Sequence, residues 1–381
     1  MRTDVFTDNE MKLFEMALNY QIRSIDENTR FWMVRTKEGY FFEEFIKNEF
    51  VALGWNRITK DTDLGKSNEE SLKEEIKNYY NDSRPMGAIN KCRNFISEIH
   101  EGDYIIIPNM GSTRIAIAKA GEYYENAQNG YEQEKDIITK IENAEYEVAQ
   151  TTCPYRKRRH IKLLRIIDPA KMSYALKRAI TNYHGLSNLD KYGEDILNCI
   201  YDCYEYQGTV TLAVNVGQKD PLKPRDISRL VNGFTEFVYA IAPNGDISIA
   251  INLNSPGPVR MKLKNAVEHL TKRKTVLIFL FIAITGGKGL GFELPGITGT
   301  IKEMKNMATE LEKEKTMLAV EQEKLKTQKI DNVEKMMKII EEAEKEGIDI
   351  NYVIEQFDTV ETLKDSLQYQ SEEIEEETEN E

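Results

Sequence analysis

The sequence predicts an α+β protein with a small β-barrel that carries inserted helices, a second small α+β module and a C-terminal helical, coiled-coil-like region. Three observations predict this class. Short apolar runs that end at glycine turns fill the first part of the chain. Strands of strict apolar alternation follow from about residue 208. Beyond Pro295, Met304, Leu311, Leu318 and Leu325 recur every seven residues among Glu and Lys.

Four apolar runs predict the strands of the barrel. They are residues 31–35, residues 51–55, which end in Gly54-Trp55, residues 104–108 after the Gly102-Asp103 turn, and residues 115–118. The chain has two tryptophans, and both lie in the first two runs. Large rings near strand ends can form a cage for a flat ligand, and they can equally fill a small core.

Helices are expected around these strands. An amphipathic helix at residues 9–23 precedes the barrel. Two helices are inserted between its strands: residues 67–80, which are strongly charged and begin at a serine, and residues 85–99, which carry an apolar stripe. We expect a long loop with some helix at 123–150, and two helices at about 173–183 and 189–204.

This layout resembles the PUA-like domains that are related to EVE domains and to the amino-terminal domains of Mrr-type restriction proteins. The resemblance rests on Trp32 in the opening strand, Gly54-Trp55, the Gly102-Asp103 turn and a basic closing strand at 158–164, and it covers about residues 30–202. It implies a PUA-like barrel that reads nucleic-acid bases, often modified ones, in an aromatic pocket, in the setting of prokaryotic defence against foreign DNA. Leu164 stands where relatives often carry Trp, so one wall of that cage differs.

The expected site follows from these motifs. Ligand contacts are expected from Trp32, Arg35, Trp55, Asn109 and Thr113. Residues 156–178 contain nine Lys or Arg against the single acid Asp168, and such side chains hold phosphates. We expect a phosphate-gripping rim, but a solvated, lysine-guarded strand edge explains the same composition. The predicted phosphate-binding residues are Arg156, Arg158, Arg159 and Lys162.

Composition limits the remaining choices. The formal net charge is −13, and the stretch 371–381 carries seven glutamates and no base, so we expect a disordered acidic tail at 368–381. A protein with this charge has no long-range attraction to nucleic acid, and binding must come from a local basic patch. The polar, acidic start predicts no signal peptide, and the four cysteines predict no disulfide framework, so a cytoplasmic location is expected.

Metal and cofactor sites are not expected. Cys199 and Cys203 are spaced by one helical turn, and two small apolar residues on a buried helix face are the favoured interpretation over a metal site with His184. The glycines at 286–291 lack the spacing of a phosphate loop. No pair of acids on adjacent strands, nucleophile elbow or dinucleotide loop was found, so we expect no catalytic residues and no enzyme activity.

The second half of the sequence predicts a module through which copies of the chain assemble. Strands at 209–216, 246–253 and 259–263 and a helix at 224–242 form the α+β module of residues 208–299. The uncharged segment 275–287 is shorter than the roughly 20 residues a bilayer span needs, so it is either a buried element or a membrane-inserting segment released on activation, with Val276–Ile284 in contact with lipid. Residues 300–367 are the coiled-coil-like region, and we expect a homo-oligomer that forms through residues 208–367.

The sequence therefore predicts an N-terminal helix at 1–29, a base-reader domain at 30–207, and the module, helical region and tail given above. The predicted function is non-catalytic recognition of nucleic acid or a nucleotide, including DNA with modified bases, as a sensor or assembly component of antiviral defence. Two alternatives from other classes are a membrane-disrupting defence effector that inserts residues 275–287, and a structural scaffold or oligomerisation protein in which the rings fill the core.

Overall fold

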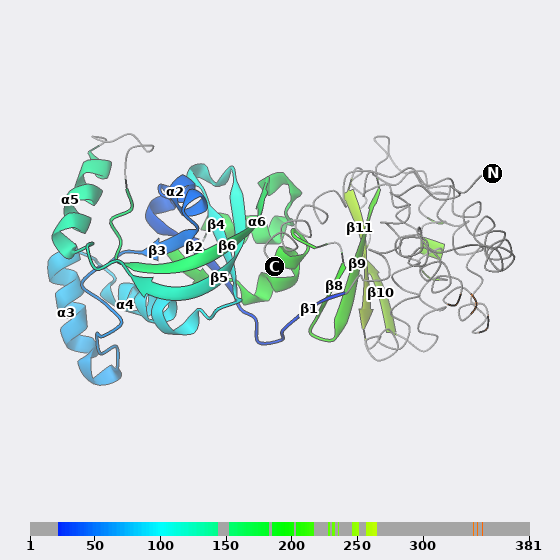
Figure 1. Ribbon diagram of the computed structural model, residues 1–381, viewed down its shortest axis with the longest axis horizontal. Coiled ribbons are helices and arrows are strands. Elements are labelled where there is room, and N and C mark those ends of the chain that lie inside the picture. Colours follow the sequence, from blue (N-terminus) through cyan, green and yellow to red (C-terminus); the bar gives the residue numbers. More distant parts are fainter. Residues whose placement is uncertain are drawn as a thin grey trace, which may run out of the picture. The chain divides into compact units, whose positions relative to one another are not determined.

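The computed structural model describes residues 22–143, 152–182, 185–201, 203–216, 246–250 and 257–264, with a few isolated positions after residue 227. The chain divides into two units (Figure 1). One is Asp26–Tyr201, and the other combines Met1–Ile25 with Asp202–Glu381. Both ends of the first unit fall a few residues before the predicted boundaries of 30 and 207.

The 26–201 unit is built on a mixed sheet of six strands in the order β3-β6-β5-β4-β2-β7. Strand β2 pairs in parallel with β4, and the other neighbours are antiparallel. The register of β5 against β6 shifts twice, and such irregularities bend and twist a sheet, which here curls into half a barrel. The strands are β2 (Phe31–Arg35), β3 (Phe50–Leu53), β4 (Tyr104–Pro108), β5 (Ile115–Glu125), β6 (Lys157–Ile167) and β7 (Gly185–Asn188).

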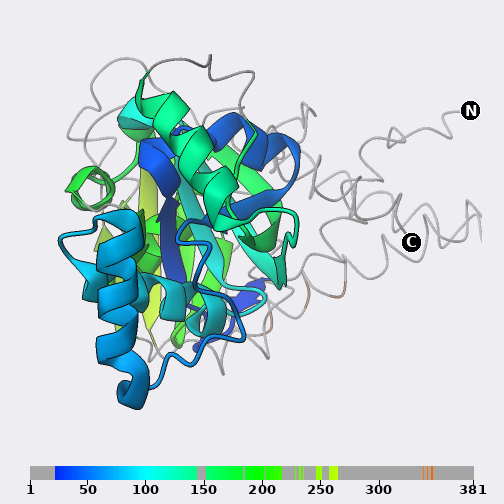
Figure 2. The same cartoon turned by 90° about the vertical axis from the view of Figure 1, so that its left-hand side faces the viewer.

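The α+β class and the four predicted strand runs are confirmed. The inserted helices are also present, as α3 (Glu69–Tyr80) and α4 (Pro85–Arg93), with one π-helical turn at Asn94–Glu98 completing the second. Two further helices, α2 (Phe42–Lys47) and α5 (Tyr131–Glu142), belong to the same unit. Helices α3 and α5 lie on one side of the curled sheet (Figure 2).

One face of the sheet forms the main core. Trp32 and Val34 of β2, Ile105 and Ile107 of β4 and alternate alanines of β5 belong to one buried cluster, together with residues of α2, α3 and α4. Because side chains alternate along a strand, these residues share one face. We call it the inner face.

The other face, which we call the outer face, is covered by the chain after β6. Phe31 of β2 stacks on Tyr104 of β4 with ring centroids 5.3 Å apart. A Cβ on Gly193 would lie 2.7 Å from the Phe31 ring, so helix α7 (Gly193–Leu197) approaches as closely as a glycine allows. The Tyr104 hydroxyl is 3.1 Å from that of Tyr201. Helix α6 (Tyr174–Asn182) buries Leu176, Ala179 and Ile180.

Of the two predictions for the connecting segments, one is confirmed in part and one is wrong. The helix expected within the loop 123–150 is α5 at Tyr131–Glu142, while β5 continues to Glu125. The predicted helix 189–204 is only the short α7, and Cys203–Tyr206 is strand β8. Gln207 and Gly208 both have positive φ, +49° and +67°. That is the backbone of a tight hairpin turn, and it joins β8 to the following strand.

The second unit contains a five-stranded sheet in the order β1-β8-β9-β11-β10. The predicted strands of the second module are confirmed as β9 (Thr209–Val216), β10 (Asp246–Ala250) and β11 (Gly257–Lys264), which pair antiparallel. Strand β1 (Arg23–Ile25) pairs in parallel with β8. The end of the predicted N-terminal helix region is therefore a strand, and residues 1–21 lie outside the described residues.

Several other predictions also lie outside the described residues. They are the apolar segment 275–287, the acidic tail and nearly all of the helices at 224–242 and 300–367. Within the part of the chain that the structure describes, no helix combines the length and apolarity needed to cross a bilayer.

Candidate ligand-binding site

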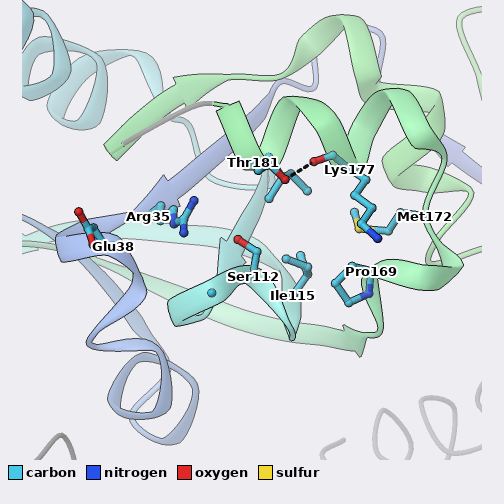
Figure 3. Close-up of a pocket in the computed structure, with 10 residues that line it drawn as sticks. Arg35, Glu38, Ser112, Ile115, Pro169, Met172, Lys177 and Thr181 are labelled. Carbon is cyan, nitrogen blue, oxygen red and sulfur yellow. Dashed lines mark hydrogen bonds between the residues drawn. The ribbon is translucent and has the colours of Figure 1, made fainter.

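A cavity of about 340 Å³ lies on the outer face of the 26–201 unit. Three parts of the chain form it: the end of β2 with the turn that follows, the loop before β5, and the segment from residue 169 to α6 (Figure 3). Its lining residues are Arg35, Glu38, Gly111, Ser112, Ile115, Pro169, Met172, Lys177, Ile180 and Thr181.

Arg35 enters the cavity because it is the last residue of β2. Alternation along the strand puts it on the same face as Phe31 and Met33, opposite Trp32 and Val34. Its Nε atom is buried and has no hydrogen-bond partner among the residues that the structure describes. Leaving a buried donor unpaired costs about 1–3 kcal/mol, and buried polar groups are nearly always paired. An oxygen atom of a ligand would remove that cost.

Two turns with unusual backbone form one wall. After Arg35, Lys37 and Glu38 have φ of +46° and +57°. In the facing turn, Met110–Ser112, Gly111 and Ser112 have φ of +78° and +53°. A non-glycine residue in this region costs of order 1–3 kcal/mol, and such residues concentrate at ligand clamps and active sites. Three of the seven non-glycine residues that have positive φ in the described part of the chain therefore belong to these two turns.

Asn109 and Thr113 shape the second turn but do not line the cavity. The Asn109 amide Nδ2 donates to Thr113 Oγ1 at 3.0 Å, and Asn109 Oδ1 accepts the backbone N–H of Arg114 at 2.9 Å. The backbone N–H of Ser112 donates to the Asn109 carbonyl at 3.0 Å. These bonds close the loop from both ends and present Gly111 and Ser112 to the cavity. Of this loop, Gly111 and Ser112 line the cavity, whereas the predicted contact residues Asn109 and Thr113 do not.

Helix α6 supplies the opposite wall. Ser173 Oγ accepts the backbone N–H of Leu176 at 3.1 Å and so caps the first turn. With Leu176, Ala179 and Ile180 buried, Lys177 and Thr181 face outwards at the cavity. The Thr181 hydroxyl donates to the Lys177 carbonyl at 2.9 Å, and Figure 3 marks this bond with a dashed line. Within the described residues, no carboxylate lies within 4.0 Å of the Lys177 ammonium or of the Arg35 guanidinium.

The lining combines charge with an apolar floor. Arg35 and Lys177 are cations, Ser112 and Thr181 offer hydroxyl oxygens, and Glu38 is the one acid among the lining residues. The floor is apolar and consists of Ile115, Pro169, Met172 and Ile180. A volume near 340 Å³ lies at the small end of the range of ligand pockets, about 300–1,000 Å³. Such a site fits a small molecule with an anionic group and an apolar or flat part.

Trp32 does not line this cavity, and the predicted two-indole cage is not formed. Its side chain is 1% exposed on the inner face. Its indole Nε1 donates to Asp103 Oδ2 at 3.2 Å, and the same oxygen accepts the backbone N–H of His100 at 2.9 Å. Asp103 Oδ1 accepts the backbone N–H of Arg30 at 3.0 Å. Trp32 and the Gly102-Asp103 turn are thus tied together as part of the core.

Trp55 is half-buried against the core, and Glu134 binds its backbone N–H. Its φ is +61°, and its backbone N–H donates to Glu134 Oε1 at 2.7 Å. Glu134 Oε2 accepts the backbone N–H of Asn56 at 2.8 Å and the Tyr80 hydroxyl at 3.0 Å. Lys157 is fully buried and donates to the carbonyls of Trp55 and Ile58, both at 2.7 Å.

This carboxylate hub explains the Gly54-Trp55 motif. A Cβ on Gly54 would lie 2.9 Å from Glu134 Oε1 and 2.9 Å from the Tyr155 ring, so only glycine fits. Burial raises the pKa of Glu134, while the N–H donors of Asn56 and Trp55 and the charge of Lys157 oppose the rise. Burial also lowers the pKa of Lys157. The motif is the structural support of a loop, and Trp55 lies outside the cavity lining.

The three arginines predicted to bind phosphate form hydrogen bonds or ion pairs with other groups of the protein. Arg158 Nη2 donates to the Cys153 carbonyl at 2.8 Å, and Arg159, which is 4% exposed, donates through Nη1 to the Gly121 carbonyl at 2.8 Å. Arg156 Nε pairs with Glu125 Oε2 at 2.9 Å. Buried arginine cannot reach a phosphate from solution, so the expected role of Arg159 is corrected. Of the four residues, Lys162 is the exposed one.

The described residues contain no group of three or more His, Cys, Asp or Glu placed to hold a metal ion. Cys203 lies in strand β8, so it is not one helical turn from Cys199, and that spacing argument was wrong. The Cys199 thiol instead donates to the Asp195 carbonyl at 3.2 Å.

A family model described as "Domain of unknown function (DUF8426)" matches residues 32–150. No curated protein and no solved structure matches the chain. The matched range contains Arg35, Glu38 and the 110–112 turn, and it ends before α6. Two lining residues of α6, Lys177 and Thr181, were not predicted as site residues. The sequence feature that could have identified them is the helical spacing, which buries Leu176 and Ile180 and leaves Lys177 and Thr181 exposed.

Proposed function

We propose that the 26–201 unit is a non-catalytic recognition domain that binds a nucleotide in the cavity between the end of β2 and α6, with its phosphate against Arg35 and Lys177. The observation that carries the proposal is the buried, unpartnered Nε of Arg35 at a cavity that contains a second cation. Charge-assisted hydrogen bonds from Arg to phosphate are among the stronger ones in proteins.

The rest of the lining supports a nucleotide over a bare anion. The floor formed by Ile115, Met172 and Ile180 suits the flat face of a base, and the hydroxyls of Ser112 and Thr181 suit a sugar. The lining contains no histidine or cysteine, and its one carboxylate is Glu38, which favours binding over catalysis. The resemblance to PUA-like, EVE-related base readers and a setting in prokaryotic defence belong to the same proposal.

Isothermal titration of the full-length protein with nucleoside monophosphates, the matching nucleosides and inorganic phosphate tests it. We expect the monophosphate to bind at least about tenfold more tightly than the nucleoside, because a hydrogen bond to a charged group contributes about 1.5–3 kcal/mol. Arg35→Gln should remove that difference.

Arg114→Gln is the matched control. Arg114 lies next to the same loop but is exposed, pairs with Glu43 at 2.6 Å and is outside the cavity lining. It should bind nucleotides as the unaltered protein does. Equal affinities of Arg35→Gln and the unaltered protein, or a panel of the common monophosphates in which none binds, would overturn the proposal.

A further inference from the structure

The exposed face of α6 continues from the cavity along the surface. Tyr174, Lys177, Arg178 and Thr181 are spaced as i, i+3, i+4 and i+7, so they form one side of the helix. All four are exposed, and Tyr174 is 79% exposed. Lys177 and Thr181 line the cavity, and the other two lie within one helical turn of Lys177. We call these four residues the α6 track.

The track is locally basic in an acidic chain. Between Asp168 and Asp190 the sequence has three Lys or Arg and no Asp or Glu, although the whole chain carries a net charge of −13. Neither Lys177 nor Arg178 has a carboxylate within 4.0 Å among the described residues. Unpaired cations on one helix face complement a chain of phosphates.

The exposed ring of Tyr174 indicates which class of nucleic acid the α6 track would bind. Tyr174 is the most exposed of the large hydrophobic side chains in the described part of the chain, where Tyr79, Met110 and Ile166 are 45%, 54% and 37% exposed. Exposed rings interleaved with cations are typical of surfaces that bind single-stranded nucleic acid, since bases stack on the rings while the backbone follows the charge. A paired base inside a duplex does not offer its face to such a ring.

We propose that the α6 track binds single-stranded nucleic acid whose phosphorylated terminal nucleotide occupies the cavity. The adjacent base stacks on Tyr174, and Arg178 contacts the next phosphate. The inference rests on the proposed nucleotide site, and it names the partner: the end of a single strand, because a cavity of about 340 Å³ has room for one nucleotide and not for a duplex.

The test compares ligands by isothermal titration of the full-length protein. The ligands are a nucleoside monophosphate, a six-nucleotide single strand with a 5′-phosphate, a 3′-phosphate or no terminal phosphate, and the same strand in a duplex. We expect one phosphorylated strand to bind at least about tenfold more tightly than the monophosphate, since one stacked base adds that much. The two phosphorylated strands distinguish which end is bound.

Three variants separate the track from the cavity. Tyr174→Ala should weaken strand binding about tenfold and leave monophosphate binding unchanged. Arg178→Gln should reduce the dependence of log affinity on log salt by about 0.7, the value for one phosphate contact on a single strand. Tyr79→Ala, which removes another exposed tyrosine, on α3, is the control and should change neither affinity.

The two proposals fail in different ways. A strand that binds no more tightly than the monophosphate, a duplex that binds equally well, or strand binding unaffected by Tyr174→Ala overturns the α6 track and leaves the nucleotide site standing. Strand binding that survives Arg35→Gln unchanged shows that no terminal nucleotide enters the cavity and overturns the α6 track, whereas the nucleotide site is overturned when monophosphate binding survives Arg35→Gln unchanged.

Discussion

The backbone of Gly39 lies directly against the backbone of Asn109. A Cβ on Gly39 would lie 2.5 Å from the carbonyl carbon of Asn109 and 2.7 Å from the amide nitrogen of Met110. The φ of Gly39 is +88°, which other residues rarely adopt. The two turns that form one wall of the cavity are therefore fixed against each other at a position that only glycine fills.

Gly39→Ala is expected to destabilise the protein by about 2–4 kcal/mol. The added methyl group meets backbone atoms that cannot turn aside as a side chain can, and overpacking of this kind costs about 1–3 kcal/mol in addition to the left-handed backbone. Urea unfolding followed by circular dichroism measures the loss. Nucleotide affinity should fall as well, because the wall that carries Ser112 must shift.

Gly102→Ala separates the two causes. Gly102 has φ +89°, nearly the same as Gly39, but apart from its own chain neighbours no atom of the described residues lies within 4 Å of the position of its Cβ. This variant carries only the conformational cost, about 1–2 kcal/mol. If both variants lose the same stability, the close approach of the two turns does not exist in solution.

Glu134→Gln is expected to change how stability depends on pH. Burial raises the pKa of Glu134 above the usual 4.5, so the folded protein binds this proton more readily than the unfolded chain. The carboxyl therefore favours folding most at low pH, and its contribution declines as the pH rises from the unfolded pKa through the folded one. The difference in unfolding free energy between the unaltered protein and Glu134→Gln should fall as the pH rises above the usual carboxyl pKa of 4.5.

Unfolding in urea at a series of pH values measures that difference. Glu132→Gln is a suitable control, because Glu132 is exposed on the same helix and should leave the profile parallel to that of the unaltered protein. A difference that grows with pH would mean that the N–H groups of Trp55 and Asn56 stabilise the charge more than burial penalises it.

The strands were predictable, but the direction of their side chains was not. Phe31 to Val34 are all buried, because both faces of β2 are covered. A run that is apolar throughout shows that a strand is present without showing which face meets which neighbour. Trp32 and Arg35 were predicted to contact one ligand together, but residues three apart on a strand point to opposite faces, so they do not line one cavity.

Only some of the residues around the cavity could be predicted from the sequence. Arg35 and the loop at 109–113 stand out as polar positions at strand ends. Lys177 comes from a helix far along the chain, and only the folded sheet brings it near. The left-handed Lys37 and Glu38 leave no mark in the sequence, because neither is a residue type that favours positive φ. The hairpin at Gln207-Gly208 was missed for the same reason, since a glutamine is unusual there.

Trp32→Phe tests whether the indole belongs to the core. We expect a loss of about 1–3 kcal/mol in unfolding free energy, because the buried hydrogen bond to Asp103 and part of the ring volume are removed. Nucleotide affinity, measured by the same titration as above, should change less than about twofold, since an altered core leaves the outer face in place. A large loss of affinity with unchanged stability would return the indole to the binding site.

Glu38→Gln tests the electrostatics of the cavity with the simplest anion. Glu38 is exposed at the rim and is the one carboxylate of the lining, so its charge opposes that of a phosphate. The neutral amide should raise the affinity for inorganic phosphate or pyrophosphate by about two- to fivefold at low salt, and the gain should shrink at about 0.5 M salt as screening increases. Glu43→Gln, exposed and outside the lining, removes the same charge nearby and should give a smaller gain. Weaker binding by Glu38→Gln would instead make Glu38 a direct partner of the ligand, reached through a proton that the two share.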